Sequence, residues 1–304
     1  MLINYEKVTA HLQDIRTGKI KEGLILGVPE IDEYFRFKPS SFNIVLGHSN
    51  TGKTTIVLYL MLAYSIKHQI KWLVFSSENE AYSIIRKLIE FLEERPIQDV
   101  PQKQFEKHSK FIYTHFKIID ANKTYTYREL LDLCKVVKDA WNYQGLLIDP
   151  YNSLIKDPKL ISSVGGHEYD YQVASEFRLF AKKKNITLFV NAHGVTEALR
   201  KVYPKGHENE GLPQPLNLAQ VEGGGKWGNR ADDVLCVHRL TGHPTEWMFT
   251  ELSVLKVKET ETGGRCTPYD APLRLRMKLN GVGFEYIGRD ILYYRQDTKE
   301  EIKF

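Results

Sequence analysis

Residues 47–54 of the chain fit the pattern G-x-x-x-x-G-K-[ST], which is typical of a phosphate-binding loop. Gly47 and Gly52 let the backbone curl so that its N–H groups face a chain of phosphates. Lys53 can then reach the β- and γ-phosphates, and the Thr54 hydroxyl can ligate Mg²⁺. The predicted nucleotide-binding run is Gly47, His48, Ser49, Asn50, Thr51, Gly52, Lys53, Thr54 and Thr55.

The residues around this loop agree with that interpretation. Phe42 to Leu46 is typical of a short buried strand, and Thr54 to Ser65 has the apolar spacing of a helix. A loop that ends on a helix N-terminus adds the partial positive charge of the helix to an anion site. The structural alternative is a glycine-rich turn that precedes a helix and binds nothing.

Three polar residues end other predicted strands. Asp149 follows four apolar positions and can hold the hydration shell of Mg²⁺ together with Thr54, or it is a surface turn residue. Glu78 can orient and deprotonate an attacking water, or it is a helix N-terminal acid, a role that Glu80 could also fill. His193 can contact the γ-phosphate and report its presence, or it is a satisfied buried histidine.

Lys256 and Lys258 lie two positions apart on a late predicted strand and therefore project to the same face. Two such cations can form a solvated strand edge that discourages aggregation. They can also reach the γ-phosphate of a neighbouring subunit, as trans-acting fingers do. Considered alone, the pair favours the first interpretation.

Composition sets bounds on the class of protein. The 304 residues are 42% hydrophobic and 26% charged, which predicts a folded chain with a sizeable core. A formal net charge of +4 is compatible with a polyanionic partner and with an ordinary, slightly basic enzyme. The three cysteines are widely spaced, so we expect neither disulfides nor a zinc site. No signal peptide or membrane span is evident, and we expect a cytoplasmic protein without a membrane partner.

Apolar runs alternate with helical patterns along most of the chain, which predicts an α/β fold with a mostly parallel sheet. Predicted strands are 71–76, 111–119, 145–150 and 186–192, and predicted helices are 84–92, 127–141 and 169–184. Residues 195–228 lack periodicity and form a long loop, which is usually functional or disordered. The final strands, at 233–238, 248–258, 272–278 and 283–287, are separated by turn signals and predict antiparallel hairpins.

These features predict three parts. Residues 1–22 form a helix, from Asn4 to Ile15, and a connector. In a monomer this amphipathic helix would cap its own core, and in a ring it could dock on a neighbour. Residues 23–290 form the main domain, and residues 291–304 are a charged, loosely held tail.

Several motifs resemble the RecA-type motor domain of ring-shaped replicative helicases, the DnaB, phage and Twinkle group. They lie in family order over about residues 24 to 288. They are the phosphate loop, Ser76-Ser77-Glu78-Asn79, residues 146–152 (LLIDPYN), Val190-Asn191-Ala192-His193, and residues 223–235 (GGGKWGNRADDVL).

The resemblance implies a RecA-like P-loop NTPase core in a homo-oligomer, expected to be a hexameric ring, with ATP and Mg²⁺ between subunits. It gives Glu78 the role of catalytic base, His193 that of γ-phosphate sensor, and Lys256 and Lys258 that of the finger pair. It also implies single-stranded DNA in the central channel, gripped by loops at about 155–168 and 195–228. The expected DNA-contacting cations are Arg200, Lys201, Lys205 and Lys226.

The chain departs from the helicase pattern in two places. The helicases usually carry Lys-x-Arg at the finger, whereas this chain has Lys256-Val257-Lys258, like the two lysines of RecA recombinases. A lysine has the positive charge of an arginine but cannot donate two parallel hydrogen bonds to one phosphate. Either Lys258 or the nearby Arg265 could therefore be the finger. The chain also has no N-terminal primase or collar domain, so we expect a motor that stands alone or that works with a separate primase or loader protein.

We interpret the sequence as an ATP-dependent DNA helicase motor of a phage or mobile element. A RecA-like recombinase would share the site but pair strands. An ATP-gated regulator or loader would assemble on a partner and hydrolyse slowly without translocation. An unrelated kinase is a remote alternative because no phosphate-acceptor pocket is readable.

Overall fold

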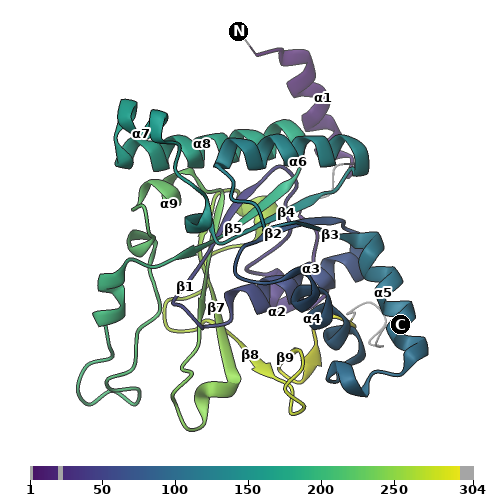
Figure 1. Cartoon of the computed structure of the whole chain (residues 1–304), viewed down its shortest axis with the longest axis vertical. Helices are drawn as coiled ribbons and strands as arrows, with labels where there is room; N and C mark the ends of the chain where they lie inside the picture. Colours follow the sequence, from purple (N-terminus) through teal and green to yellow (C-terminus); the bar gives the residue numbers. More distant parts are fainter. Residues whose placement is uncertain (1–2, 20–22, 295–304) are drawn as a thin grey trace.

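The computed structural model describes residues 3–19 and 23–294 of the chain. Six parallel strands form one side of its sheet: β1 (Phe42–Gly47), β2 (Trp72–Ser76), β3 (Phe116–Ile119), β4 (Gly145–Asp149), β5 (Thr187–His193) and β6 (Asp233–His238). Four antiparallel strands continue it: β7 (Phe249–Val257), β8 (Leu273–Met277), β9 (Phe284–Tyr286) and β10 (Arg289–Asp290). The strand order is β10-β9-β8-β7-β6-β1-β5-β4-β2-β3 (Figure 1).

Helices cover both faces of the parallel strands, which explains their continuous apolar sequences. The chain has α2 (Pro29–Asp32), α3 (Lys53–His68), α4 (Ala81–Glu93), α5 (Gln102–His115), α6 (Tyr127–Trp141) and α8 (Gly166–Lys184). It also has the short helices α7 (Pro158–Val164), α9 (Lys226–Arg230) and α10 (Thr260–Gly263).

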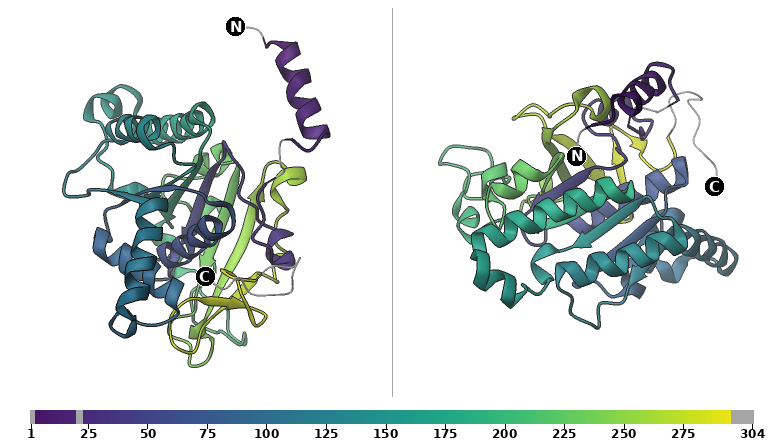
Figure 2. Two further views of the ribbon diagram at one scale, coloured as in Figure 1. Left: turned by 90° about the vertical axis from the view of Figure 1, so that its right-hand side faces the viewer. Right: turned by 90° about the horizontal axis from the view of Figure 1, so that it is seen from above.

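Two hydrophobic cores result, one on each face of the sheet. Val45, Val74 and Leu147 pack with buried residues of α3 and α4. Their neighbours Ile44, Leu73 and Leu146 point the other way and pack with α6 and α8. Successive side chains of a strand alternate between faces, so each buried strand contributes to both cores. The layered arrangement is visible from above in Figure 2.

The predicted α/β fold, with a mostly parallel sheet and C-terminal antiparallel hairpins, is confirmed. β1 lies between β5 and β6, and Gly47 stands opposite His193. β4 lies between β5 and β2, and Ser76 stands opposite Asp149. The carboxyl ends of these strands therefore meet at one edge, where ligands bind in open α/β sheets.

The predicted strand at 111–119 is wrong in its first half. Residues 111–115 form the last turn of α5, and β3 begins only at Phe116. Ile112 and His115 are buried and three positions apart, which is a helical spacing. The aromatic and β-branched residues around them favour a strand and obscure that spacing. The predicted loop at 155–168 likewise contains the short helix α7 and the start of α8.

The two ends of the chain differ from expectation. Helix α1 (Tyr5–Arg16) forms as predicted, with Asn4 as its N-cap, but none of its residues is buried in the part of the chain that the structure describes. Its apolar side chains Val8 and Leu12 are 40% and 59% exposed, so the idea that α1 caps its own core is wrong for the single chain. Figure 2 shows α1 standing away from the sheet.

At the other end, Ile291 and Leu292 are fully buried, so ordered packing continues beyond residue 290, where the tail was expected to begin. Residues 295–304 of that tail lie outside the described residues. Among the described helices, none is long and apolar enough to cross a membrane.

Candidate active site

The phosphate-binding loop connects β1 to α3, as the sequence predicts. A side chain at Gly47 would lie 2.6 Å from the carbonyl oxygen of Val237, so only glycine fits between β1 and β6 there. Gly52 has φ +86°, a left-handed conformation that glycine adopts without steric cost. The loop then enters α3 at Lys53, which places the helix N-terminus at the expected phosphate position.

Lys53 is buried beneath this loop. Its ammonium donates to the carbonyl oxygens of Gly47 and His48, both at 2.9 Å. Burial lowers the pKa of Lys53, while the charges of Asp149 and Glu78 raise it. The side chain is thus folded back on the loop, and a phosphate would give its ammonium an anionic partner.

Thr54 and Asp149 meet at the expected metal position. The Thr54 hydroxyl lies 2.9 Å from Oδ2 and 3.1 Å from Oδ1 of Asp149, a carboxylate that is only 1% exposed. These hard oxygen donors suit Mg²⁺, which keeps several waters and takes one or two protein oxygens beside substrate phosphates. The described residues contain no cluster of three His, Cys, Asp or Glu side chains that could hold a metal alone.

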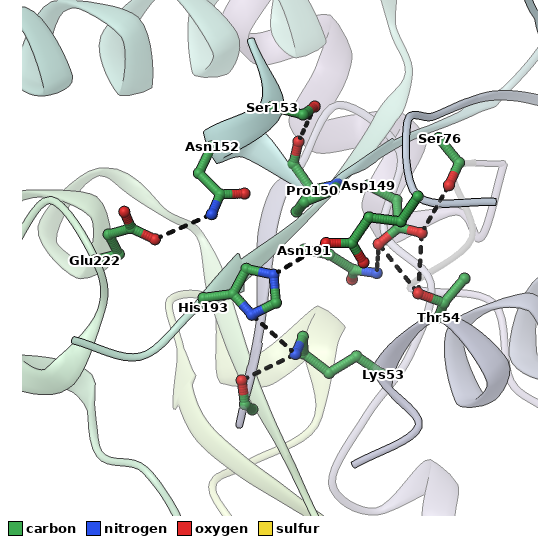
Figure 3. Close-up of polar contacts among 12 residues, drawn as sticks. Lys53, Thr54, Ser76, Asp149, Pro150, Asn152, Ser153, Asn191, His193 and Glu222 are labelled. Carbon is green, nitrogen blue, oxygen red and sulfur yellow. Dashed lines mark hydrogen bonds and ion pairs between the residues drawn. The ribbon is translucent and has the colours of Figure 1, made fainter. Parts of the chain in front are cut away.

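Asp149 is held in place by donors that the sequence analysis did not assign. Asn191 Nδ2 donates to Oδ1 at 2.6 Å, and Ser76 Oγ donates to Oδ2 at 3.1 Å. Burial raises the pKa of Asp149, and these hydrogen bonds lower it. Figure 3 shows both side chains beside Asp149. Asn191 lies within the buried strand β5 and Ser76 ends the apolar strand β2, and a polar residue at such a position is the signal that could have identified them.

His193 lies between Lys53 and Glu78. Its Nδ1 is 3.5 Å from Lys53 Nζ, and its Nε2 is 3.5 Å from Glu78 Oε1. Because an ammonium only donates, Nδ1 accepts and Nε2 carries the hydrogen that faces Glu78. The Glu78 side chain is 53% exposed, so it borders the solvent from which a nucleophilic water would come.

Lys87 is a further cation that the sequence analysis missed. It extends from α4 and donates to the hydroxyl of Thr55 at 3.0 Å. Burial lowers the pKa of Lys87, whereas Glu90 and Asp149 raise it. No motif marks this lysine, because its contact joins positions 32 residues apart on two different helices.

Lys256 and Lys258, the two late lysines, lie near the ends of the strands that are opposite the phosphate loop. β7 runs antiparallel to β6, so His238 pairs with Glu251 near the phosphate loop, and Asp233 pairs with Val257 at the far end. Lys256 donates to the carbonyl oxygens of Gly228 and Ala231, and Lys258 Nζ lies 3.4 Å from Asp232 Oδ1. Arg265 pairs with Glu33 and lies over the ring of Tyr34.

The four expected DNA-contacting cations do not form one cluster. Arg200, Lys201 and Lys205 are exposed on the long loop, defined here as residues 195–225, at the lower left of Figure 1. Lys226 lies on α9 beside α8, where it pairs with Glu168. The long loop is attached to the phosphate loop, because His48 Nε2 donates to the Gln214 carbonyl at 3.0 Å.

Comparison with solved structures identifies the fold of this domain. A DnaB-like replicative helicase, solved in a study of its interactions with primase, superposes with a TM-score of 0.67 at 13% identity, over 93% of this chain and 67% of that one. The chain has the RecA-type fold of DnaB-like helicase motor domains. A second solved structure, an isolated ATPase domain, matches this RecA-type domain with a TM-score of 0.71 at 14% identity, over 93% of this chain and 98% of that one. A KaiC-like protein of Pyrococcus horikoshii matches at 0.56 and 15% identity, over 88% of this chain and 100% of that one.

Two curated relatives align with most of this RecA-type domain. A Twinkle homolog protein, chloroplastic/mitochondrial, of Arabidopsis thaliana is 23% identical over 239 residues, which is 74% of this chain and 31% of that protein. The replicative DNA helicase DnaB of Leifsonia xyli subsp. xyli is 26% identical over 251 residues, which is 77% of this chain and 51% of that protein. The chain therefore spans a third to a half of their length. No protein-family profile matches it.

Proposed function

We propose that this chain is the motor of an ATP-dependent DNA helicase that acts in replication. It would hydrolyse ATP at the interfaces of a homo-oligomer, a hexameric ring, and translocate on single-stranded DNA. The relatives named Twinkle and DnaB support this proposal, because they align with about three quarters of the chain. The convergence of Lys53, Thr54, Glu78, Asp149 and His193 at one edge supports it chemically.

The distance between the phosphate-binding pocket and the late lysines supports a homo-oligomer. Val237 lies beside Gly47, whereas Lys258 contacts Asp232, which precedes β6 at its other end. At ~3.3 Å per residue, this length of strand is roughly 16 Å, farther than a lysine side chain extends. This distance supports the proposal that Lys258 acts on the pocket of a neighbouring copy and not on its own.

The proposed chemistry is in-line attack of water on the γ-phosphate. Glu78 accepts the proton of the water, and His193 links Glu78 to Lys53. Lys53 and a neighbour's Lys258 neutralise charge on the phosphate oxygens. Thr54 and Asp149 would hold Mg²⁺, which supplies charge neutralisation between the phosphates when it is bound.

The DNA contact proposed here is to the phosphate backbone. Arg200, Lys201 and Lys205 are exposed on the long loop, and cations of this kind bind phosphates without regard to base sequence. Binding of single-stranded DNA should therefore weaken steeply as salt is raised. Lys226 would contact the strand separately, from α9.

The motor domain, helix α1 and a separate partner protein each have a place in the proposed assembly. Residues 23–290 form the motor, and α1 with its exposed apolar side docks on a neighbouring copy. One structural neighbour was solved in a study of its interactions with primase, and we propose that a separate primase or loader protein serves this chain. The place of action is the cytoplasm, that of the bacterial host if the gene belongs to a phage.

The deciding experiment measures ATP hydrolysis with and without single-stranded DNA, together with mass in solution with nucleotide. We expect hydrolysis that DNA stimulates and a mass of several copies. Unwinding of a forked duplex without strand exchange would distinguish the helicase from a recombinase. Turnover that ignores DNA would support the regulator or loader instead, and a monomer with full turnover would overturn the motor proposal.

A further inference from the structure

Lys256 and Lys258 share a strand end but have different surroundings. The ammonium of Lys256 lies 2.7 Å from the carbonyl oxygen of Gly228 and 2.7 Å from that of Ala231. The ammonium of Lys258 lies 3.4 Å from its carboxylate partner, and its side chain is 41% exposed. A side chain that reaches across a subunit interface must release its contacts within its own chain. Lys256 would lose two short hydrogen bonds, whereas Lys258 would lose one longer ion pair.

The bonds made by Lys256 stabilise the end of α9. The last carbonyl groups of a helix have no partner within the helix, and a lysine side chain can supply one. Gly228 and Asn229 lie in the final turn of α9, and Ala231 follows it. Lys256 therefore fastens the end of β7 to the end of α9.

Helix α9 directly follows the long loop. That loop leaves β5 at His193, and it returns to the same residue, because the amide of Glu222 donates to the His193 carbonyl at 2.9 Å. On α9, Trp227 packs against Tyr151 with ring centres 4.3 Å apart, and Arg230 lies 4.2 Å from the ring of Tyr171. The long loop is thus continuous with a small helix that is packed on its own domain.

Asp232, the residue after Ala231, completes the connection. Its Oδ1 is shared between Arg178 at 3.0 Å and Lys258 at 3.4 Å, and its Oδ2 accepts from the amide of Phe42 at 3.1 Å. Lys258 is the more distant of the two cations, so it is the one that can exchange Asp232 for a phosphate. Arg178 and Phe42 keep the carboxylate in place when it does.

We propose that the two lysines have separate tasks. Lys256 is a positioning residue that couples α9, and with it the DNA-contacting long loop, to the strand that carries the finger. Lys258 is the finger that reaches the neighbour's γ-phosphate. This inference rests on the proposed function, since it presumes hydrolysis between subunits that is stimulated by DNA.

The test compares K256M with K258M in the full chain. One measurement is the affinity for ADP with aluminium fluoride, which mimics the transition state of hydrolysis. K258M should lose about 100-fold of this affinity, because it lacks a charge that acts on the transition state. K256M should lose less than about fivefold, but the stimulation of hydrolysis by single-stranded DNA should fall roughly tenfold.

K256R supplies the matched control. A guanidinium can donate to the same two carbonyl oxygens, so we expect K256R to restore stimulation by DNA. Equal loss of the aluminium fluoride complex in K256M and K258M would overturn the division of tasks, as would full stimulation in K256M. A wild-type protein that DNA does not stimulate would instead contradict the proposed function.

Hydrogen exchange of the wild-type chain keeps the inference testable if K256M does not fold. Addition of single-stranded DNA should change the protection of residues 226–231 and of residues 255–258 together. A change in the first segment with none in the second would overturn the coupling.

Discussion

The hydroxyl of Thr54 lies 2.9 Å from a carboxylate oxygen of Asp149, although the two residues are 95 positions apart in the chain. β1 leads into the helix that begins at Lys53, and β4 ends at Asp149, with β5 between them. The contact therefore depends on the order of three parallel strands. It brings together a hydroxyl and a carboxylate that would hold Mg²⁺ beside a bound triphosphate.

Asp149→Asn should raise the Mg²⁺ concentration needed for hydrolysis by about 10- to 100-fold, because outer ligands tune metal affinity by that factor. Titration of hydrolysis with Mg²⁺ at saturating ATP measures this. Asp139→Asn removes an exposed carboxylate on α6 and serves as the control. An unchanged Mg²⁺ requirement in Asp149→Asn would remove Asp149 from the metal site.

Glu78→Gln should retain nucleotide binding and reduce turnover by about 10²- to 10⁴-fold, the usual contribution of a general base. The amide cannot accept the proton of the attacking water. Binding of a fluorescent nucleotide and steady-state hydrolysis separate the two effects, with Glu80→Gln as the control. Normal turnover in Glu78→Gln would move the base to Glu80 or elsewhere.

Lys53→Ala should abolish hydrolysis, because the β- and γ-phosphates lose their buried cation. Lys258→Ala should be inactive as well, for want of the neighbour's charge. Mixing the two variants should restore part of the activity, since an intact Lys53 in one subunit then faces an intact Lys258 in another. A mixture that stays inactive, with both variants assembled and binding nucleotide, would show that Lys258 does not act in trans.

His238→Phe should make stability less sensitive to acid. His238 is 2% exposed, neither ring nitrogen has a hydrogen-bond partner among the described residues, and burial lowers its pKa from 6.5 to about 4. The unfolded chain then binds more protons between these values, so the wild type loses stability as pH falls from 6.5 towards 4. The loss is about 3 kcal/mol.

Urea unfolding at several pH values measures this contribution as the difference between the wild type and His238→Phe. Subtracting the variant removes the contributions of the carboxyl groups that titrate in the same range. A difference between the two proteins that does not change with pH would rule out His238 as the acid-sensitive group.

Much of the pocket could be predicted from local sequence. The phosphate loop contains its own glycines, lysine and threonine, and the buried strands β2, β4 and β5 each end in a polar residue on the side of the sheet where ligands bind. The structure places Glu78, Asp149 and His193 with Lys53 and Thr54, as expected. A parallel sheet supplies that convergence, because its strands all end on the same side.

Contacts between distant elements could not be predicted in this way. Nothing in the sequence around Lys87 shows that α4 brings it to Thr55, or that Lys256 meets the end of α9. Lys226 shares a loop with Arg200 by sequence, yet the path of the chain separates them. Residues 111–115 carry β-forming side chains, and packing against α4 and the sheet makes them helical instead.

If Lys258 acts on a neighbour's site as proposed, the antiparallel course of β7 gives each protomer one face that donates the lysine and one face that accepts it. A pair related by a two-fold axis would join like patches, so the two pockets would face each other or the two lysine ends would. In such a pair, neither active site would receive a lysine from its neighbour. A head-to-tail row of protomers completes every active site except the one at its open end. A row that closes into a ring has no open end, so every active site is complete.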